Sequence, residues 1–152
     1  MRCMSIMHAV ITVSDMEDAL AFYRDLLGLE VAIDHVHDPA LLEPLLGITD
    51  ADVRAVILEC PDGSDVELVE FRHPRGNPKV TKRFEDAGVS FVTIVVDDID
   101  AVVARLGDRG FAMTGPVVRH PFPSPVRVAY CLGPDGTAIT LAEFLSESEH
   151  AA

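Results

Sequence analysis

The strongest constraint on the fold of this chain is an internal repeat. Residues 60–71 read CPDGSDVELVEF and residues 133–144 read GPDGTAITLAEF, so six of twelve positions are identical at an offset of 73. A looser match relates residues 8–15 to residues 91–98. Two copies of one supersecondary unit, each too small to bury a face alone, predict a chain built from two similar modules.

Each copy has the signals of a β-α-β-β-β unit. Runs rich in β-branched residues predict the strands, a helical apolar period follows the first strand, and Pro-Asp-Gly predicts a hairpin before the last strand. In the first copy, Ser14 and Glu17 have the spacing of a helix capping box. The expected strands are 6–13, 29–36, 53–60 and 66–71, then 90–96, 111–119, 126–132 and 138–144, with helices at 15–27 and 99–109. These elements predict an α+β fold.

The length of 152 residues, 49% of them hydrophobic, fits one globular domain that folds unaided. We expect a single domain over 1–152, with a first module at 6–72, a polar linker at 73–87 and a second module at 88–145. Between the second and third strands of the first module, residues 38–50 contain four leucines, which predict a short helical lid.

Charge and hydropathy exclude several classes of partner. The formal net charge is −13 and the pI is about 4.6, so the surface repels nucleic acid and anionic membranes. The sequence shows neither a membrane span nor a signal peptide, and its three cysteines lack metal-ligand or redox spacing. We therefore expect a cytoplasmic protein with reduced thiols.

Five stretches together resemble one known superfamily. They are HAVITVSD at 8–15, AFYRDLLGLE at 21–30, VDDID at 96–100 and the two Pro-Asp-Gly hairpins with their Leu-x-Glu-Phe strands. Over residues 7–144 the chain resembles the vicinal oxygen chelate superfamily, which includes glyoxalase I, methylmalonyl-CoA epimerase, extradiol dioxygenases, and the fosfomycin- and bleomycin-resistance proteins. The resemblance implies an eight-stranded, cupped, open-barrel sheet with helices on its convex side, and a homodimer.

The resemblance also implies where metal ligands would lie. Metal-using members take a His from the first strand and a Glu or Gln from the last strand of each module, which correspond here to His8 and Glu67, then Phe91 and Thr140. Two of the four positions thus hold no ligand, and an incomplete pair binds divalent cations weakly. This departure argues against glyoxalase I, epimerase, dioxygenase and fosfomycin activity. We expect no cofactor, although a divalent metal held by His8 and Glu67 stays open, with His35, His37 or His120 as further ligands at the cavity mouth.

Two classes of function follow from these residues. The first is a binding protein that holds a small apolar or aromatic metabolite in the barrel cavity. The second is a lyase or isomerase in which His8 moves a proton and Glu67 orients it or shares a metal. The residues expected to contact a ligand are Val10, Leu45, Phe91, Thr93, Phe122 and Thr140.

Overall fold

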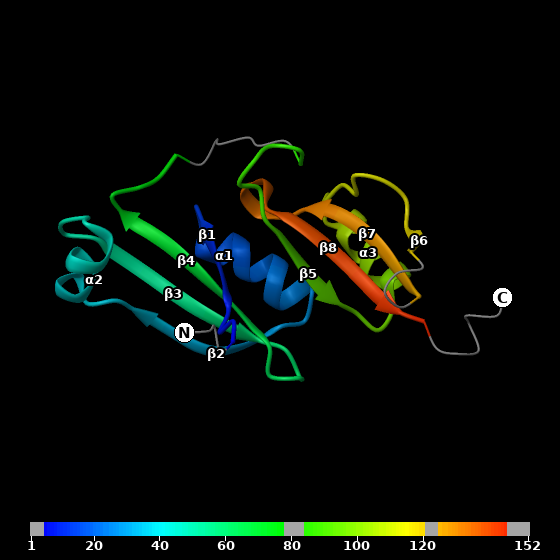
Figure 1. Cartoon of the computed structure of the whole chain (residues 1–152), viewed down its shortest axis with the longest axis horizontal. Coiled ribbons are helices and arrows are strands. Elements are labelled where there is room, and N and C mark those ends of the chain that lie inside the picture. Colours follow the sequence, from blue (N-terminus) through cyan, green and yellow to red (C-terminus); the bar gives the residue numbers. More distant parts are fainter. Residues whose placement is uncertain (1–4, 78–83, 121–124, 146–152) are drawn as a thin grey trace. The chain divides into compact units, whose positions relative to one another are not determined.

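The computed structural model describes residues 5–77, 84–120 and 125–145. The chain divides into two compact units, Met1–Val80 and Thr81–Ala152, and each is described by itself (Figure 1).

The first unit is a four-stranded sheet with a helix on one face (Figure 1). Its elements are β1 (Ala9–Val13), α1 (Met16–Leu20), the π-helical η1 (Ala21–Leu26), β2 (Glu30–Val36), α2 (Pro39–Leu46), β3 (Asp52–Glu59) and β4 (Asp65–His73). The strand order is β1-β4-β3-β2, where β1 runs parallel to β4 and the other pairs are antiparallel. Strand β2 therefore lies at one edge of the sheet.

The second unit repeats this topology. Its elements are β5 (Phe91–Val95), α3 (Ile99–Asp108), β6 (Val118–His120), β7 (Val126–Leu132), the 3-10 turn η2 (Pro134–Gly136) and β8 (Ala138–Phe144). The order is β5-β8-β7-β6, and β5 runs parallel to β8. The expected α+β fold with two β-α-β-β-β modules is confirmed, and the eight strands are hydrogen-bonded as two four-stranded sheets.

Two local expectations were wrong. Helix α1 is capped by Asp15 rather than Ser14, because the Asp15 carboxylate accepts hydrogen bonds from the backbone N–H groups of Glu17 and Asp18 at 2.9 and 3.0 Å. The strand expected at 111–119 is reduced to β6 and one isolated bridge between Met113 and Cys131. Pro116 has no N–H to donate to a strand ladder, which explains the break.

Each sheet packs one face against its own helix. In the first unit, Leu58 and Leu68 are fully buried on this face together with Phe22 of η1. In the second unit, Ile139 and Leu141 are fully buried, as is Leu106 of α3. We call this the helix face of each sheet, and the opposite side the open face.

The same helix face buries a cysteine in the second unit. Cys131 of β7 is fully buried there, and burial raises the pKa of its thiol to about 11. This thiol is therefore protonated at neutral pH, as expected of a structural rather than a reactive cysteine.

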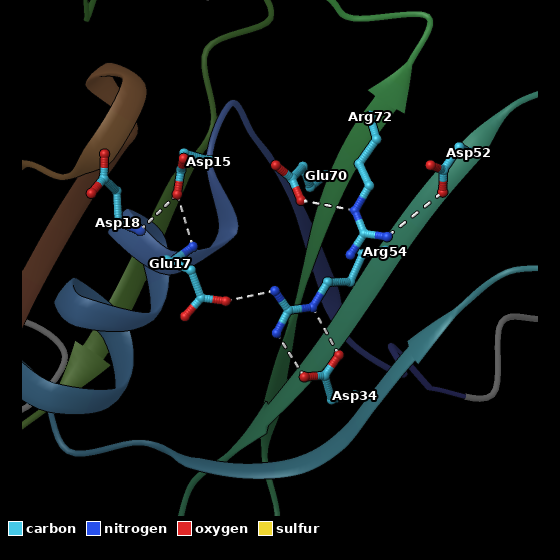
Figure 2. A network of polar contacts seen from close by, with 8 residues as sticks. All are labelled: Asp15, Glu17, Asp18, Asp34, Asp52, Arg54, Glu70 and Arg72. Atoms are coloured by element: carbon cyan, nitrogen blue, oxygen red, sulfur yellow. Dashed lines mark hydrogen bonds and ion pairs between the residues drawn. The ribbon is translucent and has the colours of Figure 1, made fainter.

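An arginine on the helix face ties the first helix to the sheet (Figure 2). The Arg54 guanidinium donates to both carboxylate oxygens of Asp34 on β2, at 2.9 and 2.7 Å, and to Glu17 of α1 at 2.7 Å. Figure 2 also shows Arg72 between Glu70 and Asp52, at 3.5 and 3.8 Å. Bidentate arginine–carboxylate geometry is the strong form of this interaction.

The second unit has the equivalent arginine. Arg127, at the 73-residue offset from Arg54, donates to Asp100 of α3 at 2.7 and 2.8 Å and to Glu143 of β8 at 3.0 Å. The repeat thus extends to an arginine ion pair that holds the first turn of each helix against its sheet. It also shows that Glu143 points to the helix face, away from the open face.

We expect the contact between Arg54 and Asp34 to make the stability of the fold depend on pH. Hydrogen bonding from Arg54 is the main cause that holds the pKa of Asp34 below its ordinary value. A depressed native pKa stabilises the fold above the unfolded-state pKa of about 3.9, and this contribution is lost as the pH falls through the native pKa. Urea unfolding of Asp34→Asn should therefore show a loss of stability at pH 6 that shrinks at pH 2.5.

The matched control for this experiment is Asp108→Asn, at the exposed end of α3. It should change stability little at either pH. A deficit of Asp34→Asn that is the same at pH 6 and pH 2.5 would contradict the assignment.

Among the described residues, no helix has the length and apolar character needed to cross a membrane.

Candidate functional site

The open face of the first sheet brings His8 together with two carboxylates. His8 precedes β1, and the pairing of Ala9 with Val66 sets it beside Asp65 at the start of β4. Its Nδ1 lies 3.4 Å from Asp65 Oδ1, and its Nε2 lies 3.2 Å from Glu67 Oε2. Strand alternation directs Asp65 and Glu67 to the same face, so the contact predicted between His8 and Glu67 is present.

The three side chains are mostly but not fully covered. The exposed fraction is 20% for His8, 24% for Asp65 and 15% for Glu67. A neutral imidazole donates through one nitrogen, whereas the imidazolium donates through both. The cluster can therefore hold a proton on His8 between two acceptors, or release it to a bound molecule, which is the chemistry of a general acid or base.

The donor set does not fit a four-ligand divalent metal site of the implied kind. The residues at the equivalent positions on the open face of the second sheet are Phe91 and Thr140, paired with Ala138 and Thr93 in the register of β5 and β8. A phenyl ring offers no ligand, and both ring nitrogens of His8 already face carboxylates. The described residues contain no cluster of three or more His, Cys, Asp or Glu side chains suited to a metal.

Helix α2 covers part of the open face of the first sheet. Leu42 packs in one buried cluster with Ala51, Val53, Ala55 and Val69. Leu45, which the sequence predicted as a ligand contact, is 77% exposed. The expected lid is thus an ordered helix whose contact with the sheet runs through Leu42.

Val10 lies on the uncovered part of that face. It pairs with Glu67 across β1 and β4 and is exposed. An apolar side chain therefore borders the His8 cluster. Its role in contacting a ligand stays a prediction.

The open face of the second sheet is apolar and aromatic. Phe91 of β5, Tyr130 of β7 and Phe84 are each 41% exposed. Their ring centroids lie 5.3 Å apart for Phe84 and Phe91, 5.9 Å for Phe91 and Tyr130, and 6.4 Å for Phe84 and Tyr130. We call these three residues the aromatic platform. Leu132 and Val95 extend it and are also exposed.

Hydroxyl groups lie beside the aromatic platform. Thr140 pairs with Thr93 on one side and with Tyr130 on the other, so the three form one cross-strand row. Thr93 is exposed, whereas Thr140 is only 7% exposed and is largely covered by its neighbours. Tyr130 was missed by the sequence analysis, because alternation puts it on the same face as Leu132 but only the register of β7 with β8 shows that this is the open face.

The other predicted residues are dispersed. His35 and His37 lie at the β2 edge of the first sheet, and their rings contact each other at a centroid distance of 4.4 Å. His120 is exposed on β6, at the edge of the second sheet. Phe122 lies outside the described residues.

Comparison with solved structures agrees with this architecture. A glyoxalase family protein from Bacillus cereus is 26% identical, with a TM-score of 0.84 over 95% of this chain and 97% of that one. A glyoxalase/bleomycin resistance protein/dioxygenase superfamily member from Sphaerobacter thermophilus is 28% identical, with a TM-score of 0.60 over 92% and 98% of the two chains. Glyoxalase I of Leishmania major, at 22% identity and a TM-score of 0.64 over 93% and 87%, shares the fold.

Sequence comparisons complete the identification. No curated protein matches the chain. The model of one family matches residues 5–141, which is most of the chain. This protein belongs to the Glyoxalase/Bleomycin resistance protein/Dioxygenase superfamily.

Proposed function

We propose that this protein binds a small apolar or aromatic molecule on the open face of its second sheet. The observation that supports this most is the aromatic platform of Phe84, Phe91 and Tyr130, whose rings contact one another yet stay partly exposed. Exposed apolar surface of this kind is typical of an interaction site. Ligand sites combine such surface with a few polar groups that set orientation.

The polar groups of the proposed site are hydroxyls. Thr93 and Tyr130 flank Thr140 in one row, so a ligand stacked on the rings would meet neutral donors and acceptors. The charge of −13 disfavours an anionic ligand. A neutral or cationic planar molecule is therefore the preferred class. We also propose that the protein is a homodimer, as the family resemblance implies.

A second candidate function is proton transfer by the His8 cluster, in a lyase or isomerase reaction. It is favoured by the two carboxylates within 3.4 Å of the His8 ring nitrogens. His8 would take a proton from a substrate carbon or return one to it, while Asp65 and Glu67 orient the ring and stabilise the imidazolium.

One experiment separates the two functions. The chain contains no tryptophan, so binding of 2-naphthol, a neutral planar phenol, can be followed by its own fluorescence. We expect saturable binding by the wild-type protein and an affinity within about twofold in His8→Ala. Absence of saturation in the wild type would refute binding at the platform. A loss of affinity of tenfold or more in His8→Ala would move the site to the first sheet and favour the enzyme.

A further inference from the structure

We propose that His35 and His37 form a binding site for a borderline divalent transition-metal ion, separate from the His8 cluster. Both lie at the β2 edge of the first sheet, His35 within the strand and His37 immediately after it. Strand β1, next to His8, lies three strand spacings away, about 14 Å at the usual spacing of about 4.8 Å. The two histidines therefore make a site of their own.

The geometry brings the two imidazoles together. Residues two apart on a strand point to the same face, and Asp34 between them points to the helix face, where it binds Arg54. His35 and His37 consequently share the open face, with ring centroids 4.4 Å apart and ring planes at 72°. Two imidazoles at this separation can turn their nitrogens towards one ion through small side-chain rotations.

One of the nitrogens is in an unfavourable environment without a ligand. His35 Nδ1 is buried and has no hydrogen-bond partner among the described residues. Leaving such a group unsatisfied is unfavourable, because it has given up its hydrogen bond to water without gaining another. His8 differs, because carboxylates lie near both of its ring nitrogens. A coordinated metal ion would use the lone pair of His35 that the protein leaves without a partner.

The donors select the class of ion. Neutral imidazole suits Zn²⁺, Ni²⁺ and Cu²⁺, whereas Ca²⁺ and Mg²⁺ require oxygen ligands. Two protein ligands leave the remaining positions to water, and the Irving–Williams order then favours Cu²⁺ over Ni²⁺.

The position of the pair suggests a consequence for α2. The backbone N–H of His37 donates to Val53 C=O at 2.9 Å, and Asp38, the next residue, caps α2 by accepting from Ala40 N–H. A metal ion at His35 and His37 would fix the start of the helix that covers part of the open face through Leu42.

Calorimetric titration of the full chain with NiCl₂ tests the site. We expect one ion per chain in the wild type, and affinity at least tenfold lower in His35→Gln and in His37→Gln. Far-UV circular dichroism checks that both variants are folded. His120→Gln, at an exposed edge-strand histidine of the second sheet, is the matched control and should bind as the wild type does, and His8→Gln tests the His8 cluster as the alternative site.

Three results of these titrations would overturn the proposed site. Unchanged affinity in folded His35→Gln and His37→Gln would overturn it, as would the absence of binding by the wild type at millimolar nickel. Binding that is lost in His8→Gln and kept in His37→Gln would place the ion at the His8 cluster, which also overturns it. Electron paramagnetic resonance of the Cu²⁺ complex should show two coupled nitrogens in the wild type and one in His37→Gln.

Discussion

Replacing Leu68 with alanine is expected to lower the free energy of unfolding by about 2–5 kcal/mol. Leu68 is fully buried at the centre of β4, paired with Ile11 on one side and Val56 on the other. Truncation removes apolar contacts and leaves a cavity between the sheet and its helix, since close-packed surroundings relax only in part. Urea denaturation followed by circular dichroism measures the change.

Two variants calibrate this result. Leu141→Ala, at the repeat-equivalent position in β8, is also fully buried and should lose a similar amount. Leu45→Ala, on the exposed side of α2, should change stability by about 0.5 kcal/mol or less. Equal losses in Leu68→Ala and Leu45→Ala would contradict the assignment of the helix face as the core.

The second large effect concerns ligand affinity. Tyr130→Ala is expected to weaken binding of 2-naphthol by about 1–2 kcal/mol, a factor of about 5–30 in the dissociation constant. Tyr130 contacts Phe91 edge-on at 83° and borders Thr140, so its loss removes both a stacking surface and one side of the row of hydroxyls. A fluorescence titration measures the change.

Tyr130→Phe is the matched variant, because it keeps the ring and removes the hydroxyl. It should retain most of the affinity if stacking dominates, and should resemble Tyr130→Ala if the hydroxyl dominates. Unchanged affinity in Tyr130→Ala, with saturable binding still present, would show that the ligand lies away from the aromatic platform.

The repeated architecture could be predicted from the sequence because both copies contain the residues that mark turns and helix ends. The two Pro-Asp-Gly hairpins are present, and glycines 28 and 110, which directly follow the helices predicted at 15–27 and 99–109, have φ values of +82°. A residue with a side chain is strained at such a positive φ, so glycine at these positions marks the helix ends in the sequence alone.

The sequence did not decide between neighbouring residues that suit the same structural role. Ser14 and Asp15 both suit a helix cap, and the side chain of Asp15 is the one that reaches the first turn. The strand before β7 looked continuous by composition, yet Gly115 and Pro116 leave only β6 and an isolated bridge. The π-helical η1 left no periodic signal distinct from that of an α-helix.

The candidate site was predictable to the same limited degree. The contact between His8 and Glu67 followed from the family resemblance, which places both residues at ligand positions, and so did the position of Phe91 on the open face. Tyr130 and Phe84 required the register of β7 with β8 and the position of a residue outside any strand. The ion pairs of Arg54 and Arg127 join a helix to a strand, and no local sequence pattern predicts such a contact.

The most direct test of the proposed function is to map 2-naphthol on the protein by two-dimensional NMR of backbone amides. Binding at the aromatic platform predicts saturable shifts centred on Phe91 and Thr93 of β5 and on Tyr130 of β7, the two strands that flank β8 in the second sheet. Saturable shifts confined to the neighbourhood of His8 and Glu67, or none up to the solubility of the probe, would contradict it.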